Sequence, residues 1–284
     1  VFVSTVALAF VARGMLALDA TLTDLIPEWR NTAHEWITLR RILAHLAGFK
    51  SGADYRTLLD KNVNMFALTE PLAAPPGAHV LYSDLGFIAL GTILARATPG
   101  RSPANAIEDE LAAMGVTSTA YCPRGVERAA IPATETDAWR GPVQGEVHDE
   151  KAYLMGGVAG HAGLFGTARD VAQLGNWYLA ALHRRPTPLD PALAREAVLE
   201  EGADGVLRRG LGWALKTTDE NSCGALMSSS TFGHTGFTGT SIWVDPWRDL
   251  NVVLLTNAVH FGRSDIRPIR AAVADAAVRA TESM

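Results

Sequence analysis

A short glycine-rich stretch, Phe232-Gly233-His234-Thr235-Gly236-Phe237-Thr238-Gly239, leads directly into two apolar runs near the end of the chain. The runs 240–245 and 250–256 have the residue content of strands, and Pro246-Trp247-Arg248-Asp249 between them is typical of a turn between antiparallel strands. We expect a further strand at 211–215 and an alanine-rich closing helix at 266–281. The last third is therefore predicted to form an antiparallel sheet with a helix on it.

Helices are predicted for most of the preceding sequence. Apolar residues recur there at helical spacing, in segments that begin at a capping residue or end at a glycine. The expected helices cover about 1–14, 37–46, 83–97, 103–114 and 167–182. The segment 120–150 is long, polar and rich in Pro and Gly, and loops of that length are often functional. The pattern predicts an α+β fold, an antiparallel sheet flanked by helices plus a mostly helical lobe.

The chain is expected to form one domain. Residues 1–36 and 206–284 are assigned to the sheet lobe with a central helix, and residues 37–205 to the helical lobe. The first 18 residues are strongly apolar, but they lack the basic start of a signal peptide, and Arg13 interrupts them too early for a membrane span. Because a helix that is apolar nearly all round lies inside a protein, we expect that a segment precedes Val1.

Composition excludes some classes of function. The net charge is −5, and no Lys/Arg block is longer than two residues, so the sequence gives no indication of a nucleic-acid partner. Cys122 and Cys223 lie far apart and have no metal-ligand spacing. One disulfide is conceivable, but two free buried thiols are the expectation.

The tripeptide Tyr82-Ser83-Asp84 opens the helix expected at 83–97. One interpretation is structural: Ser83 or Asp84 caps the helix, and Tyr82 packs against its first turn. The other is chemical, because a turn would aim Tyr82 and Asp84 to the same side. A phenol held near cations has a lowered pKa and can serve as a general base.

The tripeptide His234-Thr235-Gly236 also has two interpretations. It is either a turn entering a strand, with glycines supplying backbone freedom, or an edge strand that lines a cleft. In the second case His234 supplies a hydrogen-bond donor or a cation, and Thr235 supplies a hydroxyl for a carboxylate or carbonyl. Gly236 then permits close approach of a substrate, and the Phe237 N–H can bind an oxyanion.

A polar loop, Gln144-Gly145-Glu146-Val147-His148-Asp149-Glu150, precedes a second glycine-rich run at 156–163. His148, Asp149 and His161 could act as metal ligands, but they lack tight helical His-x-x-x-His spacing. Hydrogen bonding that shapes the loop is the preferred interpretation, so no metal is predicted.

Taken together, these segments resemble the serine β-lactamase/penicillin-binding-protein superfamily. Residues 82–87 resemble the Tyr-x-Asn motif of class C β-lactamases, and residues 232–239 resemble their Lys-Thr-Gly strand in its His-Thr-Gly form. Residues 39–48 are similar to the family's Leu-Leu-x-His-x-Ser-Gly segment, with Ala47 in place of Ser. Residues 145–150 and 156–165 resemble the branch that contains esterases and D-amino-acid peptidases. The resemblance implies a β-lactamase/transpeptidase-like fold.

The nucleophile motif of that superfamily, Ser-x-x-Lys, is absent. The four lysines follow Ala47, Leu58, His148 and Trp213 at the third position. Residues 1–16 resemble the part of the central helix that directly follows the motif. We therefore expect that the leading segment, with two strands of the sheet, lies outside this sequence.

The resemblance implies roles for eight residues. Tyr82 would act as a base beside the missing Ser and Lys, and the Phe237 N–H would contribute to the oxyanion hole. Asp84 replaces the usual Asn, and since an ionised carboxylate only accepts hydrogen bonds, it suits a cationic neighbour. His234, Thr235 and Gly236 would steer the substrate together with His148 and Asp149. Asp84 and His234 make efficient β-lactamase activity doubtful.

Two hypotheses follow for function. The first is a cofactor-free serine hydrolase that acts on an ester, a D-amino-acid peptide or a related amide, with the nucleophile missing from this chain. The second is a non-catalytic, penicillin-binding-like fragment that binds cell-wall-like peptides or a companion chain. The sequence leaves the substrate, the compartment and the oligomeric state open.

Overall fold

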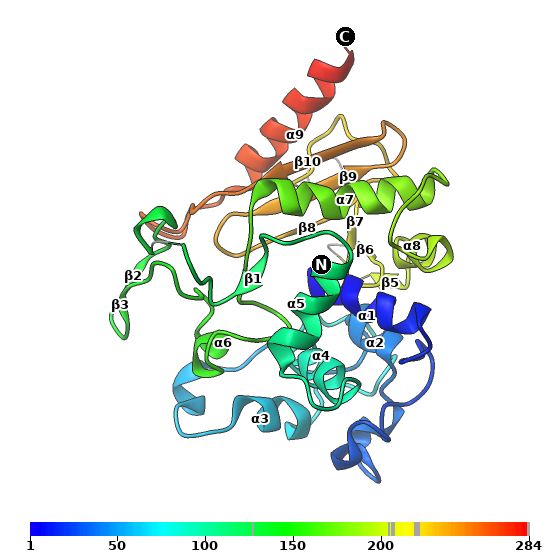
Figure 1. Ribbon diagram of the computed structural model, residues 1–284, viewed down its shortest axis with the longest axis vertical. Coiled ribbons are helices and arrows are strands. Elements are labelled where there is room, and N and C mark those ends of the chain that lie inside the picture. Colours follow the sequence, from blue (N-terminus) through cyan, green and yellow to red (C-terminus); the bar gives the residue numbers. More distant parts are fainter. Residues whose placement is uncertain (127, 204, 206–207, 219–221, 283–284) are drawn as a thin grey trace.

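A six-stranded antiparallel sheet, with helices on its faces and a further group of helices beside it, makes up the computed structural model (Figure 1). Residues 1–126, 128–203, 205, 208–218 and 222–282 are described. The α-helices are α1 (Phe2–Ala12), α2 (Leu39–Leu43), α3 (Val63–Thr69), α4 (Asp84–Arg96), α5 (Pro103–Ala113), α6 (Glu150–Leu154), α7 (Ala168–Leu182), α8 (Pro191–Ala197) and α9 (Arg267–Glu282).

The strands of the main sheet follow the order β10-β9-β8-β7-β6-β5, and each neighbouring pair is antiparallel. They are β5 (Gly202–Ala203), β6 (Arg208–Arg209), β7 (Ala214–Leu215), β8 (Phe232–Thr235), β9 (Ser241–Asp245) and β10 (Leu250–Leu254). Two small sheets pair β1 (Ala120–Tyr121) with β4 (Leu164–Phe165) and β2 (Thr136–Asp137) with β3 (Gly141–Pro142). The predicted α+β class with an antiparallel sheet flanked by helices is confirmed.

Strand β9 shows how the sheet is covered on both faces. Ile242 and Val244 belong to the main hydrophobic core, whereas Trp243 between them packs into a separate cluster with residues of α9. This alternation is the two-residue period of a strand. Helix α7 packs against β9 and β10. Gly233 pairs with Trp243, and a Cβ on Gly233 would meet the indole ring at 2.3 Å. The glycine therefore lets the indole lie flat across β8.

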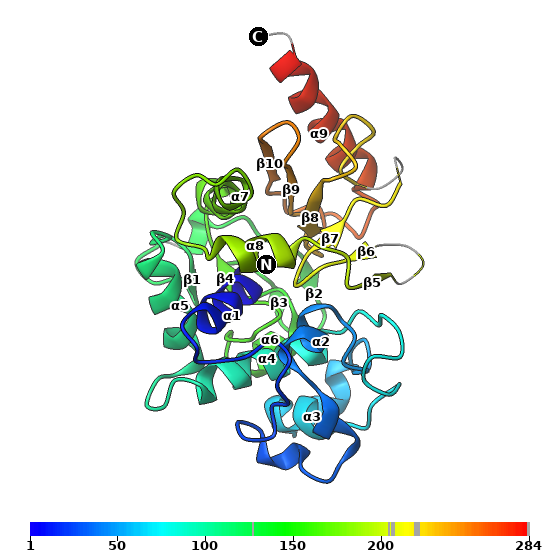
Figure 2. The same ribbon diagram turned by 90° about the vertical axis from the view of Figure 1, so that its right-hand side faces the viewer.

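Helix α1 runs through the interior, between α5 and α8 (Figure 2). Eight of its eleven residues are buried, and it ends before Gly14, which has a φ of 71°. The buried helix expected from the apolar N-terminal sequence is thus confirmed. Among the described residues, no helix has both the length and the apolar character needed to cross a membrane.

Local sequence signals located α4, α5 and α7 correctly, whereas α3, α6 and α8 were not predicted. Ser83, Ser102 and Thr167 cap α4, α5 and α7 with side chains that accept backbone N–H groups, and the turn at 246–249 does join antiparallel β9 and β10. The helix expected at 37–46 is shorter than predicted. It ends at Leu43, because His45 adopts a φ of 57° and turns the chain.

The strand expected at 211–215 is reduced to its last two residues, which form β7. The preceding backbone bonds to helical segments instead of a neighbouring strand: Leu211 N–H donates to Ala197 O, and Gly212 N–H donates to Leu43 O. Strands β5 and β6 and the small sheet strands were not predicted, because two-residue strands have no readable period. The two cysteines form no disulfide, and Cys122 is exposed, so the expectation of two buried thiols holds for Cys223 alone.

Candidate active site

A cleft of about 780 Å³ collects all eight residues that the sequence indicated. It is bordered by the starts of α1 and α4, the segment that leads into α6, the glycine-rich run, and the end of β8. Its size is that of a small-molecule site. The eight lining residues are Tyr82, Asp84, His148, Asp149, His234, Thr235, Gly236 and Phe237.

Tyr82 and Asp84 are placed by the capped start of α4. The Ser83 hydroxyl accepts the Gly86 N–H at 3.1 Å, and the Ser83 N–H donates to Nδ1 of buried His45 at 3.2 Å. The His45 ring lies behind the Tyr82 ring, with 4.5 Å between centroids. The predicted helix cap at Ser83 is therefore confirmed, and the same capped turn places Tyr82 and Asp84 in the cleft.

The Tyr82 phenol faces His234 across the cleft, with 6.3 Å between ring centroids. The Arg209 guanidinium lies over the same phenol ring at 5.3 Å. Withdrawal from bulk water, followed by the Asp84 carboxylate, raises the pKa of Tyr82 to about 12, although Arg209 and Lys151 act in the opposite direction. The lowered pKa expected from the sequence is therefore wrong for this chain, because burial and carboxylates outweigh the cations.

His234 lies on β8, which is an inner strand and not the edge strand expected. Pairing with β7 covers Phe232 and Gly233, whereas His234 and Thr235 pair with Ile242 and Ser241 of β9. The end of β8 therefore projects past β7 into the cleft. Burial is the main cause that lowers the pKa of His234 to about 3, and the Arg209 charge acts in the same direction. The imidazole is neutral at pH 7, so its interpretation as a cation is wrong.

The turn after β8 carries Gly236 and Phe237. Gly236 N–H donates to Thr240 O at 2.8 Å, and Gly236 O accepts from Nη2 of buried Arg270 at 2.7 Å. A Cβ on Gly236 would lie 2.2 Å from the Thr240 hydroxyl, so a larger residue here would force the Thr240 side chain to shift. The Phe237 ring is 64% exposed and lies 5.5 Å from the His148 ring.

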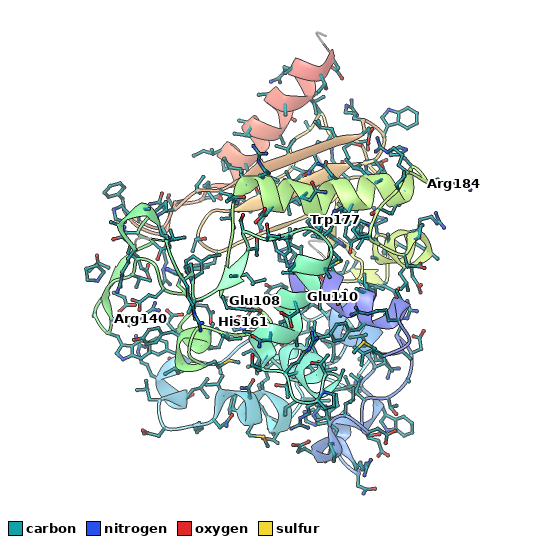
Figure 3. All side chains as sticks on the ribbon, in the orientation of Figure 1. Glu108, Glu110, Arg140, His161, Trp177 and Arg184 are labelled. Carbon is teal, nitrogen blue, oxygen red and sulfur yellow. The ribbon has the colours of Figure 1, made fainter. Side chains whose placement is uncertain are left out.

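The loop that contains His148 is held by Arg140, which the sequence did not single out. Arg140 is almost fully buried, and its guanidinium donates to the Val147 and His148 carbonyls at 2.9 and 2.8 Å. His148 Nδ1 lies 2.9 Å from the Thr134 hydroxyl, and burial lowers the pKa of His148. Figure 3 shows Arg140 on the outer, β2–β3 side of this loop and His161 further inside, near α6. The expected role of hydrogen bonding in shaping the loop agrees with these contacts.

Lys151 is the second residue that the sequence did not single out. It lies in the first turn of α6 and is buried, with Nζ 3.1 Å from Asp149 Oδ2 and 3.3 Å from Asp84 Oδ2. Asp149 also lies 2.8 Å from His161 Nε2 and caps α6 by accepting the Ala152 N–H. His161, Lys151 and the cap hold the pKa of Asp149 well below its usual range, and the two carboxylates raise the pKa of Lys151. Asp84 thus has a cation beside it that the chain itself supplies.

Comparison with known proteins identifies the family to which this chain belongs. The model of the Beta-lactamase family matches residues 1–276. The chain belongs to the Beta-lactamase family. A curated relative, a putative D-alanyl-D-alanine carboxypeptidase of Escherichia coli (strain K12), is 30% identical over 88% of this chain. The chain spans 65% of the length of that relative.

Solved structures share the fold at low sequence identity. A β-lactamase/D-alanine carboxypeptidase from Pseudomonas syringae has a TM-score of 0.75 at 20% identity, covering 98% of this chain and 81% of that one. EstCE1, a hydrolase with promiscuous acyltransferase activity, has a TM-score of 0.72 at 22% identity, covering 96% and 82%. These likenesses place the Beta-lactamase family fold over nearly the whole chain.

One group of side chains in this family member has the composition of a metal site. Among the described residues, Asp84, Asp149 and His161 each offer a ligand atom, and these atoms lie within 4.8 Å of one another. His148, which the sequence grouped with Asp149 and His161, is directed to Thr134 instead. Because the Lys151 ammonium contacts both carboxylates, it already supplies the positive charge that an ion would bring. The carboxylates of this group are therefore engaged by Lys151 and His161 in this structure.

Proposed function

We propose that the natural protein is a serine acyl hydrolase that acts on an ester, a D-amino-acid peptide or a related amide through a Ser acyl-enzyme. The nucleophile and its lysine would come from a segment that precedes Val1 in the natural polypeptide. The observation that carries this proposal is the shared cleft, in which the Tyr82 phenol faces the end of β8 beside His234. Membership of the Beta-lactamase family and the names of the relatives support it.

In this proposal Tyr82 exchanges the proton of the nucleophile or of the attacking water. The turn after β8 presents the Phe237 N–H to the oxyanion, and Arg270 holds that turn from behind. Asp84 acts through its ion pair with Lys151, and Asp149 supports the same pair. Thr235 and His148, which line the same cleft, contact the substrate.

The test uses the polypeptide that the natural reading frame encodes. We expect a Ser-x-x-Lys directly before Val1, a fluorophosphonate label on that Ser, and ester hydrolysis. Tyr82→Phe should lower turnover at least ~100-fold, the range of a lost general base. Tyr153→Phe is the matched control, since that phenol lies outside the cleft lining.

Several results would contradict the proposal. A natural start at Val1 without a companion chain, or an unlabelled full-length protein, would favour the non-catalytic penicillin-binding-like alternative. An unchanged rate in Tyr82→Phe would remove Tyr82 from the mechanism. The 284-residue chain alone should take up no specific label, and a labelled serine within it would overturn the assignment.

A further inference from the structure

The two ring nitrogens of His234 have different roles in the cleft. Nδ1 lies 2.9 Å from the carbonyl oxygen of Thr235. A carbonyl oxygen only accepts hydrogen bonds, so Nδ1 must carry the proton and donate it. In a neutral imidazole the other nitrogen then has a lone pair and no hydrogen. The nitrogen left for a ligand in the cleft, Nε2, is therefore an acceptor.

The surroundings oppose protonation of Nε2. Arg209 lies behind the Tyr82 ring, close enough for its charge to disfavour an imidazolium at His234. The Thr235 hydroxyl also lines the cleft, but a hydroxyl can either donate or accept and so does not discriminate between ligands. The choice between a charged and an uncharged ligand group thus depends on His234 and the charged lining.

The charged lining of the cleft is predominantly acidic. Among the described residues that line it, the carboxylates are Asp84, Glu146, Asp149 and Glu150, and the cations are Lys151 and Arg263. Ion pairs balance part of this charge: Lys151 pairs with Asp84 and Asp149, Arg263 with Glu135, and Arg128 with Glu146. At His234 itself a carboxylate would meet a lone pair that offers it no hydrogen bond, whereas an N–H or O–H group of a ligand could donate to it.

We propose that the cleft selects substrates that present an uncharged hydrogen-bond donor to His234, such as a carboxamide or hydroxyl, and discriminates against a free terminal carboxylate. This inference rests on the proposed function, since it names the substrate class for the same site. It sets this chain apart from a carboxypeptidase, whose substrate ends in a carboxylate. His234 is then a specificity-determining residue.

Binding to the 284-residue chain tests the inference without any turnover. The probes are N-acetyl-D-alanyl-D-alanine and its C-terminal carboxamide, which have nearly the same shape but differ in charge and in hydrogen-bond donors. We expect calorimetry at pH 7 to show the carboxamide binding about fivefold more tightly, the value of one hydrogen bond. His234→Lys should reverse the preference, shifting the ratio at least ~10-fold toward the carboxylate. His183→Lys, at the far end of α7, adds the same charge outside the cleft and should leave the ratio unchanged.

A second measurement addresses the imidazole directly. Long-range ¹H–¹⁵N spectra at pH 7 should show His234 as the neutral Nδ1–H tautomer, assigned by its loss in His234→Gln. Two kinds of result would overturn the inference. In the binding experiment these are equal or tighter binding of the carboxylate, no saturable binding of either probe, or an unchanged ratio in His234→Lys. In the spectra they are an Nε2–H tautomer or a doubly protonated ring. An unlabelled full-length protein would contradict the proposed function alone, because neither the probe ratio nor the tautomer depends on acylation.

Discussion

Replacing Lys151 by Met tests whether the paired carboxylates beside Tyr82 depend on one buried ammonium. The substitution keeps most of the side-chain volume and removes the charge that contacts Asp84 and Asp149. Removing one partner of a fully buried ion pair costs about 3–5 kcal/mol, and breaking an exposed pair costs about 0–1 kcal/mol. The Lys151 side chain is 10% exposed, but those of Asp84 and Asp149 are 28% and 23% exposed. We therefore expect an intermediate loss of about 2–3 kcal/mol.

Urea unfolding at pH 7, followed by tryptophan fluorescence, measures this loss. Lys50→Met is the matched control, because Lys50 pairs with Glu70 at the surface with its side chain 45% exposed, and its loss should stay below about 1 kcal/mol. In an Asp149→Asn background the effect of Lys151→Met should shrink, since the two residues are coupled. If Lys151→Met unfolds at the same urea concentration as Lys50→Met, or if its effect in the Asn background is undiminished, the assignment of Lys151 to this network is wrong.

Three further predictions follow from local geometry. Gly160→Ala should destabilise the fold by more than about 2 kcal/mol in urea unfolding, because its Cβ would lie 2.0 Å from a backbone carbonyl, whereas Gly52→Ala meets only an ordinary contact at 3.8 Å and should stay near wild type. Ellman's reagent should modify exposed Cys122 in the native protein and buried Cys223 only after unfolding; two fast thiols would contradict the packing. The pKa of Asp149 is depressed in the folded protein, so the stabilisation by this carboxylate is present above its unfolded pKa near 4 and is lost as the pH falls through the folded value. Asp149→Asn should therefore flatten the acid limb of a curve of unfolding free energy against pH, and an unchanged limb would refute this.

Local rules were sufficient for much of the fold. Helix caps such as Ser83 and Thr167 depend on a side chain and a backbone N–H only a few residues away, so the sequence itself identifies them. The antiparallel pair β9–β10 was readable from two apolar runs and a turn. The prediction of a strand at 211–215 failed because long-range hydrogen bonds to α8 and α2 replaced the expected strand pairing. The division into two lobes stays a prediction.

In the candidate site, too, features that depend on neighbouring residues were predicted and features that depend on long-range contacts were not. Motifs with a family resemblance identified eight residues that do line one cleft. Lys151 and His45 were missed as site residues because no spacing rule connects Lys151 with Asp84 or His45 with Ser83. Arg140 was missed because it bonds to backbone carbonyls, which no sequence motif marks. The charge states of Tyr82 and His234 were also misjudged, since both depend on burial and on Arg209, which only the folded chain brings near.

The two misjudged charge states have one electrostatic consequence. A positive charge placed between Tyr82 and His234 lowers the pKa of both groups, because it favours the phenolate and opposes the imidazolium. In this chain Arg209, which lies over the Tyr82 ring, already acts on both groups in that direction. A lysine that the proposed preceding segment brought near both groups would therefore move Tyr82 toward use as a base and would keep His234 a neutral acceptor. The base assignment and the discrimination against carboxylates thus require the same sign of charge at the same place, so the proposed mechanism and the proposed selectivity are compatible in one cleft.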